Sequence, residues 1–297
     1  MKRIAVLTFV LVAVSAFVAA PRLRAAAALF TGHVAARDVT YCTVDGVDLK
    51  MNIVYPNSTG AEPAVVYVHG GGWTGGSKDR VGPEATELIR RGYVVASIDY
   101  RLAPRYRFPA QIEDAKCAIR YLRAHAATYR IDPSHIGVWG GSAGGHLVAL
   151  LGLAGTSAGW DNDGEYPDQS SAVQAVVDYF GPADLTDPVF AELHSDLMRS
   201  VFGASAPSDP AAAKASPVTY VKPGAPPFLI VQGDSDAVVP AGQSQELYSE
   251  LNHAGDSARL IIVENAGHGF VPVGSPISPS REQIARLTAD FFDAHLK

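Results

Sequence analysis

The sequence predicts an α/β fold in which a mostly parallel sheet of about eight strands carries helices on both faces. Short apolar runs alternate with segments of helical periodicity along the chain. The runs are continuously apolar, as in strands buried on both faces, and several of them end abruptly in glycine-rich or charged loops. The 297 residues, 47% hydrophobic and 18% charged, exclude a disordered chain, a coiled coil and a polytopic membrane protein.

Residues 1–27 have the pattern of a secretory signal peptide. Lys2 and Arg3 precede an apolar run over residues 4–20, and an alanine-rich stretch follows. A basic start, an apolar middle and small residues at the cleavage position are typical of such peptides. The alternative is an uncleaved anchor, because the run is at the lower limit of a membrane span. We expect cleavage, a secreted or periplasmic protein, and no membrane span in the mature chain.

Export would also permit a disulfide between the two cysteines, Cys42 and Cys117. Their positions in the sequence leave open whether the thiols come within bonding distance. Neither cysteine belongs to a C-x-x-C pattern, and no H-E-x-x-H segment occurs. We therefore expect no metal site.

Residues 31–297 are expected to form one domain that opens with an antiparallel hairpin. The expected strands are residues 38–43, 47–55, 64–68, 93–98, 136–139, 173–179, 228–231 and 260–263. The expected helices are residues 84–91, a helix opened by Pro109, residues 143–153 and residues 284–295. The Asp45-Gly46 dipeptide favours a tight turn between the first two strands, and Gly92 suits the end of the first helix. Two segments, 155–171 and 183–227, interrupt the alternation of strands and helices. We expect them to be short lid inserts and not separate domains.

A glycine-rich segment, Gly140-Gly141-Ser142-Ala143-Gly144, separates an expected strand from an expected helix. A serine at such a sharp turn is held exposed, and the flanking glycines let the turn pass its neighbours. The amide of Ala143 would lie at the helix start, where unpaired N–H groups favour an anion. We therefore predict that Ser142 is a nucleophile, against the alternative of an ordinary Gly/Ser loop.

A nucleophilic serine needs a base, and the base needs an acid that orients it. His268 follows the last expected strand and lies between two glycines, which suits an exposed imidazole. Asp234 and Asp236 follow the preceding strand. We predict His268 as the base and Asp236 as the acid, and we expect Asp234 to bond backbone amides of its own loop, as aspartate does in turns. Asp178, at the end of another strand, is a weaker candidate for the acid.

Acyl transfer also needs donors aimed at the developing oxyanion. The segment His69-Gly70-Gly71-Gly72-Trp73 directly follows the third expected strand. Three successive glycines let the backbone approach a substrate closely and turn its amides inward. We assign Gly71 and Gly72, together with Ala143, to an oxyanion hole. Trp73 is expected to form a wall of the substrate pocket, with a packed structural role as the alternative.

Several of these segments occur together in one known group of enzymes. They are His69-Gly70-Gly71-Gly72-Trp73, Gly140-Gly141-Ser142-Ala143-Gly144-Gly145, Asp99-Tyr100-Arg101-Leu102-Ala103-Pro104 and Phe108-Pro109-Ala110-Gln111. With them the chain resembles the esterases and lipases of the α/β-hydrolase group related to hormone-sensitive lipase. Three more segments, Arg130-Ile131-Asp132-Pro133, Asp178-Tyr179-Phe180-Gly181-Pro182 and Asp236 to Pro240, make it similar to the bifunctional feruloyl and acetyl-xylan esterases. The resemblance implies an α/β-hydrolase fold and ester hydrolysis without a cofactor, and it favours Asp236 as the acid.

The chain departs from that group in one respect, since little but the hairpin precedes the first glycine motif, where relatives usually carry a helical cap. The absence of an N-terminal cap domain favours an open cleft edged by the two inserts. Such a cleft would suit short-chain acyl esters, or acetyl and feruloyl esters on sugars and polysaccharides. The expected function is therefore that of a serine carboxylesterase acting on a small-molecule or polysaccharide-linked ester.

Two other functions remain as alternatives. A prolyl-oligopeptidase-type peptidase shares the fold and the same three residue types, but usually adds a gating domain. A non-catalytic binding protein of this fold usually lacks one of the three residues. The net charge of −6, without a basic stripe, argues against a nucleic-acid partner. The oligomeric state stays open.

A few polar residues are expected to have supporting roles only. Asp99 and Arg101 lie at a strand end and are expected to form an ion pair that buttresses the oxyanion loop. His146, just inside the helix after Ser142, is expected to be structural. Asp161, Asp163 and Glu165 lack the rest of a calcium-binding loop, and we expect a solvated acidic loop there.

Overall fold

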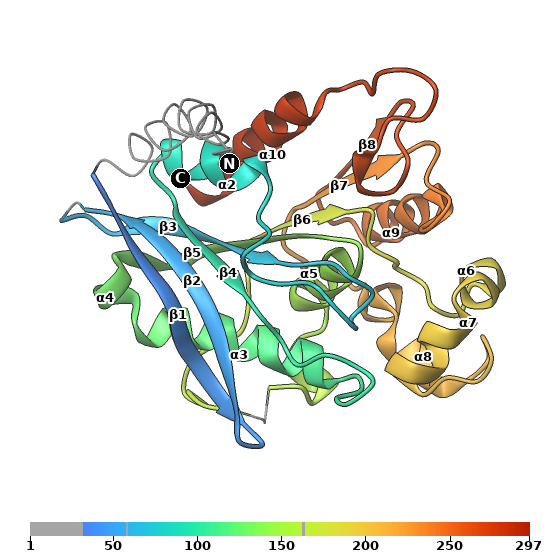
Figure 1. Ribbon diagram of the computed structural model, residues 1–297, viewed down its shortest axis with the longest axis horizontal. Helices are drawn as coiled ribbons and strands as arrows, with labels where there is room; N and C mark the ends of the chain where they lie inside the picture. Colours follow the sequence, from blue (N-terminus) through green and yellow to red (C-terminus); the bar gives the residue numbers. More distant parts are fainter. Residues whose placement is uncertain (1–31, 58, 162–163) are drawn as a thin grey trace, which may run out of the picture.

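The computed structural model shows one mixed sheet of eight strands covered by helices (Figure 1). It describes residues 32–57, 59–161 and 164–297, so the expected signal peptide and Asp163 lie outside the described residues. The strands are β1 (His33–Val44), β2 (Val47–Pro56), β3 (Glu62–Val68), β4 (Val94–Ile98), β5 (Ile131–Gly141), β6 (Ala175–Tyr179), β7 (Phe228–Gly233) and β8 (Ala258–Val263).

The strand order is β1-β2-β4-β3-β5-β6-β7-β8. Strands β3 to β8 pair in parallel, whereas β2 pairs antiparallel with both β1 and β4. The predicted mostly parallel eight-stranded sheet is therefore confirmed. Asp45 and Gly46 both have positive φ, of 52° and 73°, as a tight hairpin turn requires. The first strand begins earlier than expected, because its pairing with β2 extends out to His33.

The longer helices flank the sheet on both sides. They are α2 (Pro83–Arg90), α3 (Ala110–Ala124), α5 (Ala143–Leu153), α9 (Ala241–His253) and α10 (Arg281–Leu296). Shorter helical segments are α4 (Ala126–Tyr129), η1 (Thr156–Ala158), α6 (Pro188–Leu193), α7 (Ser195–Leu197), η2 (Met198–Phe202), α8 (Pro210–Ala215), η3 (Pro217–Tyr220) and η4 (His268–Phe270). Helices α2 and α10 pack in one apolar cluster, and α3, α5 and α9 pack in the other.

Strand β3 shows why the buried strands are continuously apolar. Val66 and Val68 point into the cluster that contains α3 and α5, while Val65 points into the cluster that contains α2 and α10. Side chains alternate between the two faces of a strand, and both faces are covered here, so both sets of side chains are apolar after Glu62 at the strand's start. The central strands thereby form a rigid base from which the loops at their carboxyl ends project.

Cys42 and Cys117 form a disulfide, with their Cα atoms 6.5 Å apart. The bond joins the hairpin strand β1 to helix α3 through two cysteines that are 75 residues apart in the sequence. The sequence left this pairing open, and it depends on α3 packing beside the hairpin.

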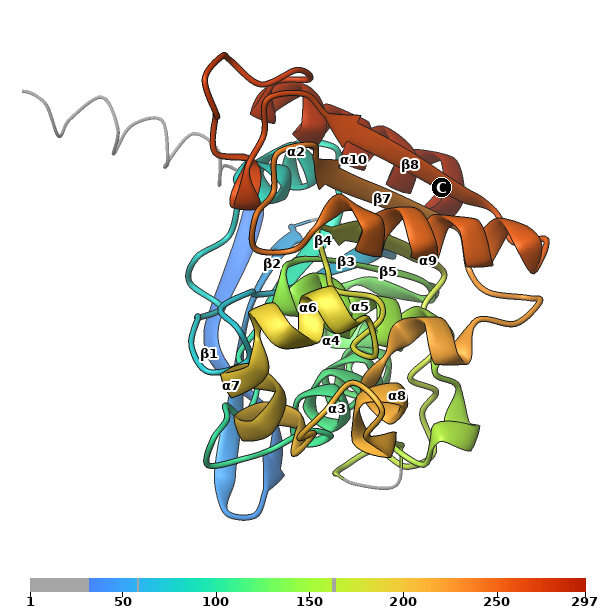
Figure 2. The same cartoon turned by 90° about the vertical axis from the view of Figure 1, so that its right-hand side faces the viewer.

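The second insert carries α6, α7 and α8 on the side of the molecule away from the hairpin β1–β2 (Figure 1). Figure 2, with this side facing the viewer, shows α6, α7 and α8 in front of α3 and α5. The first insert instead contacts α3, where Asp161 pairs with Lys116, and Trp160 contacts the ring of Phe108 just before α3 at 5.2 Å. The first insert is thus tied to α3, while the second carries the helices α6, α7 and α8.

Candidate active site

Ser142 occupies the turn between β5 and α5 in a strained backbone conformation. Its φ is 57° and its ψ is −123°, a region that costs a non-glycine residue about 1–3 kcal/mol. A Cβ on Gly140 would lie 2.5 Å from the carbonyl oxygen of Gly144, and one on Gly144 would run into that of Val68. Both positions therefore require glycine. The tight turn holds the serine hydroxyl at the end of the sheet.

The imidazole of His268 lies between Ser142 and Asp236. Its Nε2 is 3.0 Å from Oγ of Ser142, and its Nδ1 is 2.8 Å from Oδ2 of Asp236. Asp236 follows β7 and His268 begins η4 after β8, so two adjacent strands supply the two groups. The structure thus brings together the three residues that the sequence placed far apart.

Asp236 is held as an anion. Its side chain is fully buried, which opposes the charge, but the hydrogen bond from His268 and the backbone amide of Val239 keep its pKa below the ordinary value. The amides of Val238 and Val239 donate to Oδ1 at 2.8 and 2.9 Å. An ionised Oδ2 can only accept, so Nδ1 of His268 carries the proton and Nε2 presents its lone pair to Ser142.

The other two candidate acids bond elsewhere. Asp234 accepts hydrogen bonds from the amides of Asn265 and Ala266, so it ties its own loop to the loop that precedes His268. These backbone amides lie in the neighbouring loop, and within its own loop Asp234 accepts from the hydroxyl of Ser235 at 2.9 Å. Asp178 accepts from the amide of Gly181, and burial raises its pKa to about 7.

The loop after β3 presents its glycines beside Ser142. Gly71 and Gly72 have positive φ, of 121° and 59°, and the carbonyl of Gly71 accepts from the amide of Gly75 at 3.0 Å. This turn closes the loop back on itself. Ala143 is the first residue of α5, where an amide has no partner within the helix. The three residues assigned to an oxyanion hole therefore lie close to the serine, on a turn and at a helix start.

A cavity of about 310 Å³ opens beside Ser142 and His268. Its other lining residues are Gly71, Gly72, Trp73, Pro182, Phe190, His194, Leu197, Val238 and Val239. Trp73 is thus a wall of the pocket and is also packed, since it is only 3% exposed. Phe190, His194 and Leu197 come from the second insert, and no pattern in the sequence marked them. None of the described residues of the first insert (155–161 and 164–171) lines this cavity, so for these residues the expectation that both inserts edge the cleft was wrong.

The family model BD-FAE matches residues 51–251. The chain belongs to the BD-FAE family. Among its relatives are the esterases LipQ and LipC of Mycobacterium tuberculosis (strain ATCC 25618 / H37Rv). LipQ is 36% identical over 237 residues, which cover 77% of this chain and 54% of LipQ. LipC is 36% identical over 231 residues, which cover 75% of this chain and 57% of LipC. The BD-FAE chain therefore spans a little over half the length of these two relatives.

Solved structures of similar fold include proteins described as esterases. A truncated carbohydrate esterase from gut microbiota is 29% identical with a TM-score of 0.74, covering 88% of the BD-FAE chain and 95% of that chain. Esterase 2 of Thermogutta terrifontis, phosphorylated by paraoxon, is 28% identical with a TM-score of 0.73, covering 89% and 94%. The fold of the BD-FAE chain is that of the α/β-hydrolases, as the resemblance implied.

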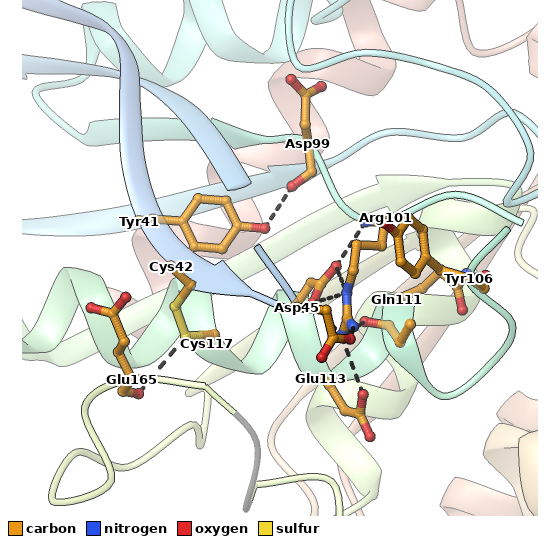
Figure 3. A network of polar contacts seen from close by, with 12 residues as sticks. Tyr41, Cys42, Asp45, Asp99, Arg101, Tyr106, Gln111, Glu113, Cys117 and Glu165 are labelled. Atoms are coloured by element: carbon orange, nitrogen blue, oxygen red, sulfur yellow. Dashed lines mark hydrogen bonds and ion pairs between the residues drawn. A yellow bond between two sulfur atoms is a disulfide. The ribbon is translucent and has the colours of Figure 1, made fainter. Parts of the chain in front are cut away.

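Asp99 and Arg101 of the BD-FAE chain do not pair with each other, so that expectation was wrong. Arg101 is buried and binds Asp114 of α3 at 2.8 Å, because this buried carboxylate needs a compensating charge. Figure 3 shows Arg101 turned toward Asp45 and Glu113, with Asp99 pointing away.

Asp99 instead supports the loop that carries the glycine motif. Its Oδ1 accepts from the backbone amide of Lys78 at 2.7 Å, and the Lys78 ammonium lies 3.3 Å from its Oδ2. His69, which opens the same loop, stacks on the ring of Tyr100 at 4.2 Å. The buttress therefore exists, but Lys78 provides it and Arg101 does not.

The expected solvated acidic loop is also corrected for Asp161. Its carboxylate lies 2.8 Å from the ammonium of Lys116, whose side chain is 2% exposed, and 3.4 Å from Arg120. The buried lysine on α3 requires this counter-charge, and the ion pair fixes the first insert on α3. Glu165 is exposed and accepts from the amide of Thr43.

Within residues 32–57, 59–161 and 164–297 of the BD-FAE chain, no group of three or more His, Cys, Asp or Glu side chains is arranged to hold a metal ion. In the same part of the chain, no helix is long and apolar enough to span a membrane.

Proposed function

We propose that this protein is a serine carboxylesterase. The observation that carries the proposal is the imidazole of His268, which is within hydrogen-bonding distance of both Ser142 and the buried carboxylate of Asp236. Nucleophile, base and orienting acid are then complete, and the amides of the glycine loop lie beside them. The esterase names of its relatives and structural neighbours support the same reaction.

The reaction follows from the geometry. His268 accepts the hydroxyl proton as Oγ of Ser142 attacks the ester carbonyl, and the amides of Gly71, Gly72 and Ala143 stabilise the oxyanion. The alcohol leaves with the proton from His268, and an acyl-enzyme remains. Water then attacks by the same route and releases the acid. Asp236 keeps the imidazole in one tautomer and stabilises its cationic form.

The substrates that we propose are short-chain acyl esters, or acetyl or feruloyl esters on sugars and polysaccharides. The cavity of about 310 Å³ is at the lower end of the range of roughly 300–1,000 Å³ for small-molecule pockets. Its apolar lining and small size favour a short acyl group. A structural neighbour described as a carbohydrate esterase supports the choice of alcohol.

We propose further that the protein is exported after removal of residues 1–27. The basic start and the apolar run that follows it support this location. The Cys42–Cys117 disulfide supports it as well, because such bonds persist in oxidising compartments.

The test is hydrolysis of p-nitrophenyl esters from acetate to palmitate, with acetylated xylan and methyl ferulate alongside. A Ser142→Ala variant and intact-mass detection of paraoxon labelling are run in parallel. Labelling lost in the variant, with activity concentrated on short or sugar esters, is the expected result. Labelling of Ser142 together with a maximum of hydrolytic activity on long-chain esters would refute the substrate class. Absence of any Ser142-dependent ester hydrolysis would refute the esterase and direct the test to prolyl peptides.

A further inference from the structure

His146 is a buried histidine that the proposed reaction does not use. It lies one helical turn after Ser142 on α5, and its amide donates to the Ser142 carbonyl at 3.0 Å. Its side chain is completely enclosed. The rings of Trp73, Phe108 and Phe202 contact it edge-on at 5.1, 6.2 and 5.8 Å. A polar group in such surroundings must have its hydrogen bonds satisfied.

Both ring nitrogens of His146 have a partner, and the partners fix its tautomer. The indole Nε1 of Trp73 can only donate, so Nδ1 of His146, at 3.2 Å, must accept. The carbonyl of Ala215 can only accept, so Nε2, at 2.7 Å, must carry the proton. Only the neutral ring can make both bonds. Burial lowers the pKa of His146 to about 4, so the ring is neutral throughout the ordinary working range.

The two partners belong to different parts of the site. Trp73 directly follows Gly72 in the glycine loop and has a positive φ of 57°. Ala215 ends α8 of the second insert. The same insert brings Leu197 within 3.7 Å of where a Cβ on Gly72 would lie, and the ring of Phe202 packs on Trp73 at 4.9 Å. His146 is therefore bonded to both segments that enclose the substrate pocket.

We propose that His146 is a positioning residue that holds the oxyanion loop through Nδ1 and the second insert through Nε2. These two bonds fix the positions of both segments relative to α5, the helix that follows Ser142. The bond to Trp73 positions the amides that act in the transition state, and the bond to Ala215 positions the pocket wall that binds substrate. This inference rests on the proposed function. It predicts that the two bonds affect different kinetic constants.

Two substitutions separate the bonds. In His146→Gln the amide nitrogen can reach the position of Nε2 and donate to Ala215, but nothing accepts from Trp73. In His146→Asn the amide oxygen lies near the position of Nδ1 and accepts from Trp73, but the bond to Ala215 is lost. Trp73→Phe removes the indole donor directly. His295→Gln, at an exposed position of α10, is the matched control and should behave as wild type.

The expected loss in His146→Gln is roughly ten- to a hundredfold in kcat on p-nitrophenyl acetate, with KM within about twofold, because displaced oxyanion donors act in the transition state. Trp73→Phe should show the same loss, and the double variant no further one. His146→Asn should instead raise KM and change the ratio of kcat/KM between acetate and hexanoate esters by about fivefold or more. All rates are expressed per site titrated with paraoxon, so a smaller folded fraction does not count as lost turnover.

Wild-type hydrolysis that depends on Ser142 is measured first on the same esters, and its absence would refute the proposed function itself. If it is present, equal effects of the Gln and Asn substitutions on kcat and KM would overturn the role of His146. So would a Trp73→Phe variant with full kcat. Should the His146 variants fail to fold, the Trp73→Phe result alone decides whether this hydrogen bond positions the oxyanion loop.

Discussion

Replacing Asp236 by asparagine should nearly abolish turnover while leaving the fold intact. The amides of Val238 and Val239 donate to Oδ1 at 2.8 and 2.9 Å, so the asparagine oxygen would stay there and its NH₂ would face His268. Nδ1 of the imidazole, 2.8 Å away, must then accept, and the proton moves to Nε2. A protonated Nε2 cannot take the proton of Ser142.

The expected loss in kcat depends on which of two orientations the side-chain amide of the asparagine adopts. Turning the amide over would restore an acceptor for Nδ1 but would cost two backbone hydrogen bonds, about 1 kcal/mol each. It would also leave a neutral partner for the imidazolium. The wrong tautomer therefore prevails, and a wrong tautomer lowers kcat by roughly 10⁴-fold. This factor corresponds to about 5 kcal/mol of transition-state stabilisation.

The assay is steady-state hydrolysis of p-nitrophenyl acetate, with the melting temperature as a check of folding. Asp234→Asn is the matched control, because Asp234 is exposed and bonds the amides of Asn265 and Ala266. It should keep kcat within about tenfold and lower the melting temperature only slightly, because its carboxylate is exposed to solvent. The acid assignment would be refuted if Asp236→Asn kept more than a tenth of wild-type kcat while Asp234→Asn lost activity.

Three further outcomes concern stability. Replacing Cys42 and Cys117 by alanine should lower the free energy of unfolding by about 4.5 kcal/mol in urea titrations, the loop-closure value for a separation of 75 residues. An unchanged midpoint would contradict the bond. The pKa of Asp178, about 7, lies above that of the unfolded chain, so the contribution of this group to stability should fall as pH rises from about 4 to about 7. Asp178→Asn should remove this contribution to the pH dependence, which is up to about 4 kcal/mol in urea titrations at the two pH values. Gly144→Ala should lower the free energy of unfolding by about 1–3 kcal/mol in the same titrations, because the alanine Cβ would collide with the carbonyl oxygen of Val68 in β3. Gly155→Ala should not lower it, because a Cβ there would lie in open space.

The sequence predicted the features whose cause is local. The Asp45-Gly46 turn needs positive φ at two neighbouring residues, and the sequence there shows it directly. The continuously apolar runs predicted buried parallel strands, because burial on both faces excludes polar residues. The glycines around Ser142 predicted a tight turn for the same kind of reason, since a Cβ there collides with neighbouring backbone.

The candidate site could be predicted because each of its members follows a strand. Parallel strands end at one edge of the sheet, so residues after different strands meet there. Strand position alone does not distinguish Asp234 from Asp236 as the acid, because both follow β7. It depends on which carboxylate faces the loop of His268, and the distances show that Asp236 does.

The predictions for Arg101 and Asp161 were wrong because the partners of these side chains come from distant segments of the chain. Arg101 lies two residues from Asp99 but binds Asp114, because α3 places a buried carboxylate beside it. Asp161 lies in a loop of acidic appearance but pairs with Lys116 on α3. A buried charge takes the nearest opposite charge in space, and separation along the chain does not measure that distance.

The sequence by itself therefore determined the strands, the hairpin turn, the elbow at Ser142 and the set of residues from which the candidate site is drawn. The tertiary structure alone decided the strand order, the Cys42–Cys117 bond and the placement of the second insert over the pocket. It also decided that His146 touches both the glycine loop and that insert. The physical reason is the sequence distance over which each cause acts. Turn conformation and the apolar pattern of a buried strand are visible in neighbouring residues, whereas side-chain partners and pockets depend on which distant segments pack together.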